Sequence, residues 1–197
     1  MPSNGSIPSG SLALDFLNTV GISRGRPIDL LGTADDLLGW LGRAGLLSDR
    51  RLAHALASPA TARLLLTEAH RLRGEIRRLV DACSLQSTIP DGTIFAVNRM
   101  LEASHTTVRL TIVPEGLRLV EHEAGDSVLT ILAPLALAAS RLVTTAEPSR
   151  IRRCAAQQCT NWFVDTSKGG RRRWCSMARC GNRAKAAKHR RKRSSTG

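Results

Sequence analysis

Apolar residues recur every three or four positions over most of the first 105 residues, which is the period of amphipathic helices. Thr33-Ala-Asp-Asp36 has the form of a capping box, and it predicts a helix that ends at Gly45. Ser58-Pro59 predicts the start of a long helix whose apolar stripe runs to Cys83, because serine is a good N-cap and proline fits the first turn. Two more helices are expected over about 48–57 and 91–103.

The period then changes from that of a helix to that of a strand. Thr107 to Val113 and Leu117 to Glu123 alternate apolar and polar residues, which predicts a hairpin with a three-residue turn at Pro114-Glu-Gly116. An apolar helix is expected next, from about Asp126 to Val143, with a bend or interruption at a proline, residue 134. A short linker over 144–149 should close this part of the chain.

This order predicts a mainly α (α+β) protein with a helical N-terminal domain, residues 1–149, that contains one β-hairpin. A small C-terminal module, residues 150–197, should follow it. The longest uncharged apolar run, Ser127 to Ser140, has 14 residues, fewer than the roughly 18 that a membrane helix needs. The N-terminus lacks the basic start and apolar stretch of a secretory signal. We therefore expect a cytoplasmic protein with no membrane segment.

Positive charge is concentrated in the C-terminal module. The chain carries a net charge of +13, and from Arg150 onward it has 15 Lys and Arg against one acid, Asp165. The first 149 residues are close to neutral, with 14 bases and 15 acids. A near-neutral body with so basic an appendage is typical of a protein that binds a polyanion, and nucleic acid is the expected partner.

Four of the five cysteines lie within 27 residues, in the arrangement Cys154-x4-Cys159-x15-Cys175-x4-Cys180. Two close pairs separated by a loop let four thiolates converge on one tetrahedral site, which is the geometry of structural zinc. Two disulfides and an iron–sulfur cluster are the other readings, and a cytoplasmic setting disfavours the first of them. A catalytic zinc would need an open coordination position, which four sulfurs do not leave. The sequence thus favours one structural Zn²⁺.

The segments around these cysteines favour a treble-clef-like finger. Residues 161–165 are expected to form one strand, 166–170 a turn, and 171–174 the returning strand. Ser176 can cap a helix that runs through Ala187. Because so small a module has little core, zinc binding would supply much of its stability.

Within the module, Arg172-Arg173-Trp174-Cys175-Ser176-Met177 and Cys180-Gly181-Asn182-Arg183 closely resemble the signature of the CGNR zinc-finger family. Members of that family usually carry an N-terminal ABATE domain, and residues 14–19, Leu-Asp-Phe-Leu-Asn-Thr, resemble its opening motif. Together the resemblances span nearly the whole chain, although the hexapeptide is short. They imply a bacterial, stress-induced transcription regulator with a zinc-binding, DNA-binding tail.

A basic helix after the last cysteine fits the major groove of double-stranded DNA, where arginine reads guanine and asparagine reads adenine. Asn182 and Arg183 are therefore candidate base or phosphate readers. Both also lie beside Cys180, and their side chains would equally well hold the zinc ligands in place. The full set of candidate nucleic-acid-binding residues is Arg171, Arg172, Arg173, Arg179, Asn182, Arg183, Lys185, Lys188, Arg190 and Arg191.

The N-terminal domain shows no catalytic set of residues, so an enzyme is not expected. Asp15 and Asn18 are candidates for a site that binds a small-molecule effector, although a polar pair near a chain end also serves to tie that end down. The leading hypothesis is a DNA-binding regulator whose body senses a ligand or forms a homodimer. A basic zinc module would also suit an RNA- or ribosome-associated factor, and the sequence leaves this alternative open.

Overall fold

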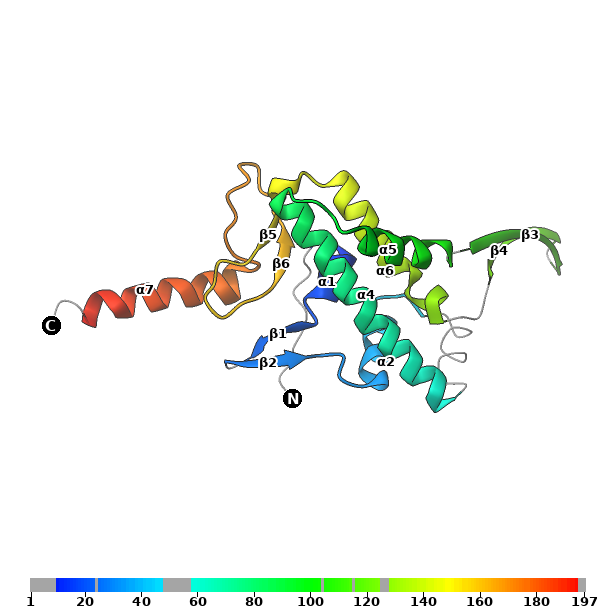
Figure 1. Ribbon diagram of the computed structural model, residues 1–197, viewed down its shortest axis with the longest axis horizontal. Coiled ribbons are helices and arrows are strands. Elements are labelled where there is room, and N and C mark those ends of the chain that lie inside the picture. Colours follow the sequence, from blue (N-terminus) through cyan, green and yellow to red (C-terminus); the bar gives the residue numbers. More distant parts are fainter. Residues whose placement is uncertain are drawn as a thin grey trace.

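The computed structural model describes residues 10–23, 25–47, 58–103, 105–114, 116–124 and 128–194 (Figure 1). The first part of the chain contains, in order, α1 (Leu12–Leu17), β1 (Val20–Ser23), β2 (Arg26–Asp29), α2 (Ala34–Arg43), α4 (Pro59–Leu85), α5 (Asp91–Glu102), β3 (His105–Val113), β4 (Gly116–Ala124) and α6 (Val128–Thr145). The second part contains the 3₁₀ turn η1 (Pro148–Arg150), β5 (Ile151–Arg153), β6 (Trp162–Val164), the π-helical turn η2 (Met177–Gly181) and α7 (Asn182–Ser194).

Helix α4 is the central helix of the first part of the chain, called the body below, and α1, α2, α5 and α6 pack against it. The predicted N-cap is confirmed, since the Ser58 side chain accepts a hydrogen bond from the Thr61 N–H. The helix ends where Gln86 adopts a left-handed conformation, with φ of +52°. The apolar stripe inferred from the sequence is the face that enters the core, and Cys83 is partly buried against that core.

Helix α2 begins and ends close to where the sequence places it. Thr33 and Asp36 form both halves of the capping box, with the Asp36 N–H donating to the Thr33 hydroxyl and the Thr33 N–H donating to the Asp36 carboxylate. Gly45 follows the C-cap with φ of +70°, a conformation that glycine adopts without strain. The short helix expected over 48–57 lies outside the described residues.

Helix α6 runs unbroken through Pro134, so the interruption allowed for there does not occur. Proline removes one hydrogen bond from the ladder, but Leu132 and Leu135 beside it are fully buried and hold the helix in the core. The helix continues to Thr145, so the connection to the second part of the chain is shorter than predicted. Among the described helices, α6 alone is long and apolar enough to cross a membrane. Its packing against α1, α4 and α5 accounts for that composition.

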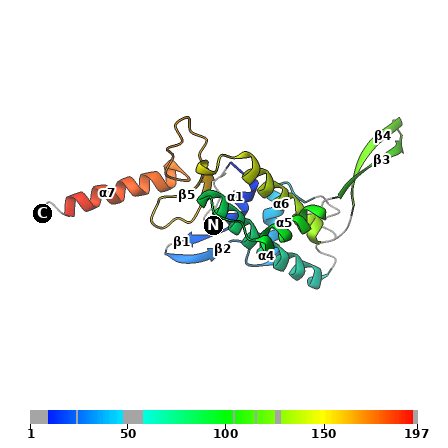
Figure 2. The ribbon, with the colours of Figure 1, turned by 45° about the horizontal axis from the view of Figure 1, so that its top comes forward.

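The predicted hairpin is present as β3–β4, and it projects from the helices without a sheet neighbour (Figures 1 and 2). Val113 pairs with Gly116, so the turn is one residue shorter than expected and Gly116, with φ of +125°, belongs to the strand. A second hairpin, β1–β2, was not predicted, because its strands have only four residues each. The mainly helical α+β class is confirmed.

A part-buried ion pair inside the body was also missed. Arg73, on α4, is 7% exposed and donates from both terminal nitrogens to the Asp29 carboxylate at the end of β2. It also donates to the Thr19 hydroxyl at 2.8 Å. Helical periodicity gave no sign of this contact, because the two partners lie 44 residues apart.

The β5–β6 hairpin of the second part packs directly on the body. Ile151 and Trp162 are 1% and 2% exposed, and they belong to the same buried core as α1, α4 and α6. The Asn18 side chain, just after α1, pairs with the Trp162 backbone: its amide donates to the Trp162 C=O at 2.9 Å, and its carbonyl accepts from the Trp162 N–H at 2.8 Å. The Ser84 hydroxyl donates to the Ile151 C=O at 3.0 Å. The body and the cysteine-bearing module therefore share a packed interface.

The change Asn18→Ala tests this interface. It removes two hydrogen bonds and leaves a part-buried N–H and C=O of Trp162 without their partner, so we expect a loss of about 1–3 kcal/mol in the free energy of unfolding. Urea denaturation followed by circular dichroism measures it. The matched change Asn98→Ala, at an exposed position on α5, is the control, since no hydrogen bond joins that side chain to the second part within the described residues. Equal stabilities of the two variants would contradict the assigned role of Asn18.

Candidate zinc centre and nucleic-acid interface

The connection between β5 and β6 carries the first cysteine pair. The two strands are antiparallel, with Ile151 opposite Val164 and Arg153 opposite Trp162. Just beyond the last pair, the Cys154 N–H donates to the Asn161 C=O at 2.8 Å, which closes the loop that bears Cys154 and Cys159. The returning strand predicted over 171–174 is wrong, because the partner of β6 precedes the first cysteine and leaves 171–174 as an extended loop.

The second cysteine pair comes from the start of the C-terminal helix. Cys175 ends the loop, and Ser176 caps the following turn, with its hydroxyl accepting from the Arg179 N–H at 3.2 Å. This confirms the predicted cap. The turn is π-helical and places Cys180 on its buried side, after which α7 extends to Ser194, beyond the predicted end at Ala187.

The four cysteine sulfurs meet at one point. All four Sγ atoms lie within 4.8 Å of one another, and the Sγ of Cys175 is 3.7 Å from those of both Cys159 and Cys180. Four Zn–S bonds of about 2.3 Å in a tetrahedron place sulfurs about 3.8 Å apart. No cysteine forms a disulfide in the described structure. The donor set and its spacing fit a single structural Zn²⁺, which the protein binds here.

The electrostatics of the cluster explain why it needs a cation. Burial, together with repulsion from the neighbouring sulfurs, raises the pKa of Cys180 to about 11. The hydrogen bond with Cys159 and burial raise the pKa of Cys175 well above its ordinary value. The hydrogen bond from Cys175 lowers the pKa of Cys159 to about 5, so this sulfur ionises more readily than those of Cys175 and Cys180. A divalent cation offsets this repulsion and lets all four bind as thiolates.

Two N–H donors, one from a side chain and one from the backbone, point at the sulfurs. The Arg183 guanidinium lies 3.6 Å from the Sγ of Cys180, and the Cys175 N–H lies 3.4 Å from the Sγ of Cys154. Such contacts orient thiolate ligands and spread the excess negative charge of a four-sulfur site. The contact of Arg183 with Cys180 agrees with one of the two roles that the sequence left open for Arg183, that of holding a zinc ligand in place.

Asp165, directly after β6, organises the loop that leads to Cys175. Its side chain is fully buried and accepts hydrogen bonds from the Ser167 hydroxyl and N–H and from the Arg172 N–H, with the Arg152 guanidinium 3.4 Å away. The bond from the Ser167 hydroxyl lowers the pKa of Asp165 to about 2, with burial opposing it and the backbone N–H groups adding to it. The single acid of this basic module is thus a structural residue.

The change Asp165→Asn should destabilise the finger at pH 7. The folded pKa lies below the ordinary 3.8, so the carboxylate contributes its full stability above about pH 3.8 and loses it as the pH falls toward 2. We expect the melting temperature of the zinc-loaded protein to fall by roughly 5 °C. Differential scanning calorimetry measures it, with the exposed Glu102→Gln as the control. An unchanged midpoint would contradict the role given to Asp165.

With this geometry in place, two comparisons identify the chain. Residues 10–146 match the ABATE family, described as "Putative stress-induced transcription regulator". The chain belongs to the ABATE family. Residues 150–193 of this ABATE protein match the CGNR zinc finger, in agreement with the resemblance seen in the sequence. A search of curated proteins finds no match.

The structure gives Arg172 contacts within the finger rather than toward solvent. Its Nε donates to the Trp174 C=O at 2.9 Å, another nitrogen donates to the Cys175 C=O, and its guanidinium lies 4.6 Å from the centroid of the buried Phe163 ring. These contacts hold the loop that carries Cys175. Among the candidate nucleic-acid-binding residues of this ABATE protein, Arg172 thus has a structural role in the finger.

The other candidates lie on two neighbouring segments. Arg171 and Arg173 are exposed on the loop before Cys175, and the Arg173 guanidinium lies 5.3 Å from the Trp174 ring centroid. Trp174 itself packs beside the cysteine cluster, as expected for a core residue of the finger. The remaining exposed candidates are Arg179 on η2 and Asn182, Arg183, Lys185 and Arg190 on α7. Lys188 and Arg191 also lie on α7, but their side chains are outside the described part of the structure.

The two candidate effector residues, Asn18 and Asp15, lie in different surroundings. Both Asn18 amide atoms are engaged by the Trp162 backbone, so its observed contact joins the body to the finger. Asp15 lies in α1, where it is partly buried. The other interpretation of Asp15 and Asn18 was that they hold the N-terminal segment in place. The contact of Asn18 agrees with it, although the sequence gave no sign that the partner lies 144 residues away.

Proposed function

We propose that this protein is a zinc-dependent, DNA-binding transcription regulator of the cytoplasm, in which the finger and α7 contact double-stranded DNA. The observation that carries the proposal is the position of α7. This 13-residue helix extends away from the rest of the molecule, and its described neighbour is η2 (Figures 1 and 2). An α-helix of this kind fits the major groove of DNA.

The charge of the finger supports a polyanion partner. Seven Lys and Arg lie among the 13 residues of α7, and no acid lies there. Without an apolar face, the helix has no means of burying itself against the body. Phosphate groups would neutralise these bases and release counterions, so binding should weaken steeply as salt rises. Arg171 and Arg173 would extend the same surface, while Asn182 and Arg183 are placed to contact bases or phosphates.

The N-terminal domain, residues 1–149, would sense a ligand or mediate dimerisation. The β3–β4 hairpin supports the second of these roles. Ile112 and Leu117 face each other across its tip and are 84% and 70% exposed, and exposed apolar residues on an unpaired hairpin favour association. A homodimer would place two basic helices on one DNA duplex.

Equilibrium binding to three nucleic acids tests the proposal. The zinc-loaded full chain is titrated into labelled duplex DNA, single-stranded DNA and structured RNA of equal length, and fluorescence anisotropy is recorded across a salt series. We expect duplex affinity to exceed RNA affinity by at least about tenfold at roughly 0.1 M salt. Equal or tighter binding to RNA would overturn the regulator proposal in favour of an RNA- or ribosome-associated factor.

A further inference from the structure

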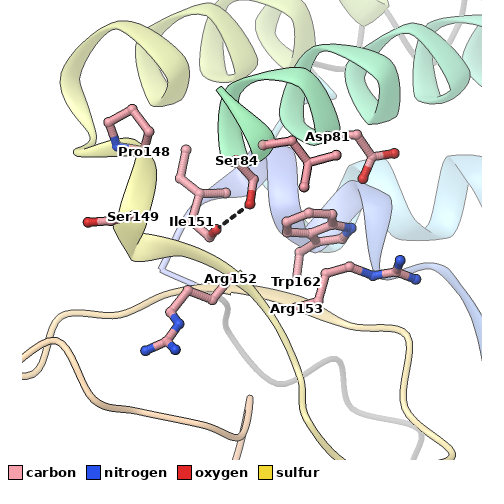
Figure 3. A pocket seen from close by; sticks show the side chains of 9 residues that line it. Asp81, Ser84, Pro148, Ser149, Ile151, Arg152, Arg153 and Trp162 are labelled. Atoms are coloured by element: carbon pink, nitrogen blue, oxygen red, sulfur yellow. Dashed lines mark hydrogen bonds between the residues drawn. The ribbon is translucent and has the colours of Figure 1, made fainter. Parts of the chain in front are cut away.

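An open cleft of about 340 Å³ lies where the body meets the finger (Figure 3). Its body wall is the end of α4, with Asp81, Ser84 and Leu85, and the opposite wall is η1 with β5 and β6. The hydrogen bond from the Ser84 hydroxyl to the Ile151 C=O ties the two walls together. The volume falls at the lower end of the roughly 300–1,000 Å³ of small-molecule sites.

Two opposite charges line this cleft without pairing. Asp81 comes from α4 and Arg153 from β5, and Figure 3 shows both on the same side of the Trp162 indole. No ion pair within 4.0 Å joins either of them to another described residue. Arg77 lies near both charges: burial lowers its pKa, Asp81 raises it, and Arg153 and Arg73 lower it further. The cleft thus offers one carboxylate and one guanidinium that remain available to a ligand.

The indole N–H of Trp162 is a further hydrogen-bond donor at this cleft. The residue is 2% exposed, and its indole Nε1–H is buried without a hydrogen-bond partner among the described residues. The nitrogen faces the side of Asp81 and Arg153, and the Arg153 guanidinium lies 5.7 Å from the ring centroid. A buried donor without an acceptor destabilises the folded protein, because it loses the hydrogen bond it makes with water in the unfolded chain. An acceptor held by Arg153 would come within reach of this N–H.

Apolar surface lies beside these polar groups. Leu85 is 76% exposed at the end of α4, and Pro148 stands on the opposite wall. Ile151 is buried beneath them. A ligand with a short apolar body would cover Leu85 while its polar end reaches Asp81 and Arg153.

We infer that this cleft binds a small zwitterion with an apolar body, of the class of the apolar amino acids. The carboxylate of the ligand pairs with Arg153 and accepts from the Trp162 Nε1–H, and its ammonium pairs with Asp81. Its side chain packs on Leu85 and Pro148. Because the ligand touches α4 and β5 at once, it strengthens the attachment of the finger to the body, and the regulatory meaning of that attachment rests on the proposed function.

Calorimetric titration of the zinc-loaded full chain tests this site without DNA. The probes are L-leucine, L-methionine and L-phenylalanine, together with 4-methylpentanoate and 3-methylbutylamine, which each keep the leucine skeleton and one of its charges. We expect at least one amino acid to bind with a dissociation constant below about 1 mM. If leucine binds, the two single-charge analogues should bind at least about tenfold more weakly. If methionine or phenylalanine binds instead, the same comparison is made with the desamino and decarboxy analogues of that amino acid.

Two variants assign the charges. Asp81→Asn should remove the advantage of the amino acid over the carboxylate analogue, and Arg153→Gln should remove its advantage over the amine. Glu102→Gln and Arg63→Gln, which make the same charge changes at exposed positions on α5 and α4, should bind normally. Zinc content and melting temperature establish that each variant is folded. The inference is overturned if no amino acid saturates the protein up to about 10 mM, if a single-charge analogue binds as tightly, or if neither variant alters binding. None of these outcomes depends on whether the protein binds DNA.

Discussion

The change Cys175→Ser is expected to remove the zinc ion and to unfold the finger. A serine hydroxyl does not replace a thiolate as a zinc ligand, and metal binding supplies about 10–16 kcal/mol in small zinc modules. Cys175 also lies at the centre of the cluster, 3.7 Å from two of the other sulfurs. Metal analysis by mass spectrometry should show zinc falling from about one ion per chain to nearly none.

Loss of zinc should also lower the stability of the helical body. From the sequence alone, the cysteine change would unfold the tail and leave the helices of the body intact, but Ile151 and Trp162 are part of the body's core. Removing a large buried side chain from a core costs about 3–5 kcal/mol, so we expect the helical melting temperature to fall by roughly 10 °C. The control is Cys83→Ser, because Cys83 packs on the core of the body and is not one of the four clustered sulfurs. A Cys175→Ser protein that retains one zinc would contradict the assignment of the ligands.

Removing three charges from the C-terminal helix is expected to give the largest loss of DNA binding. The triple change Arg179→Gln, Lys185→Gln and Arg190→Gln alters exposed positions on η2 and α7. If each contacts a phosphate, the slope of log affinity against log salt should decrease by about 3. The affinity at roughly 0.1 M salt should fall on the order of 100-fold, at about 1.4 kcal/mol for each factor of ten. Anisotropy titrations across the salt series measure both quantities.

A charge-matched control separates local contact from net charge. The triple change Arg63→Gln, Arg118→Gln and Arg141→Gln removes the same charge from exposed positions of the body. It should leave the salt slope unchanged and lower the affinity by less than about threefold, since charges beyond a Debye length are largely screened. Equal losses in the two triple variants would show that α7 is not the contact surface.

The features that the sequence predicted correctly are those that local chemistry decides. The capping box at Thr33 and Asp36, the Ser58 cap and the Ser176 cap each need only residues within one helical turn. The four cysteines were sufficient to predict a zinc site, because their spacing allows four sulfurs to converge. The long apolar stripe of α4 predicted its buried face, since a stripe of that length has one stable orientation against a core.

The features that the sequence missed depend on partners far apart in the chain. The order of a strand, a turn and a basic segment suggested that β6 pairs with residues 171–174, but its partner is β5, which precedes Cys154. The contacts of Arg172 within the finger, including its packing on Phe163, had no local signal, because the basic run around it shows only its charge. For Asn18 the sequence left both a ligand site and a tie for the chain end open, and it could not name the partner, because Trp162 is brought to Asn18 only by the complete fold.

The dependence of DNA binding on zinc tests most directly the claim that the metal folds the module that presents α7. One preparation is assayed on duplex DNA at a fixed salt concentration with zinc bound, after chelation, and after one equivalent of zinc is returned, and zinc content is measured each time. We predict that affinity falls at least about tenfold on chelation and recovers with the single equivalent. Unchanged duplex affinity in the zinc-free protein would contradict this account.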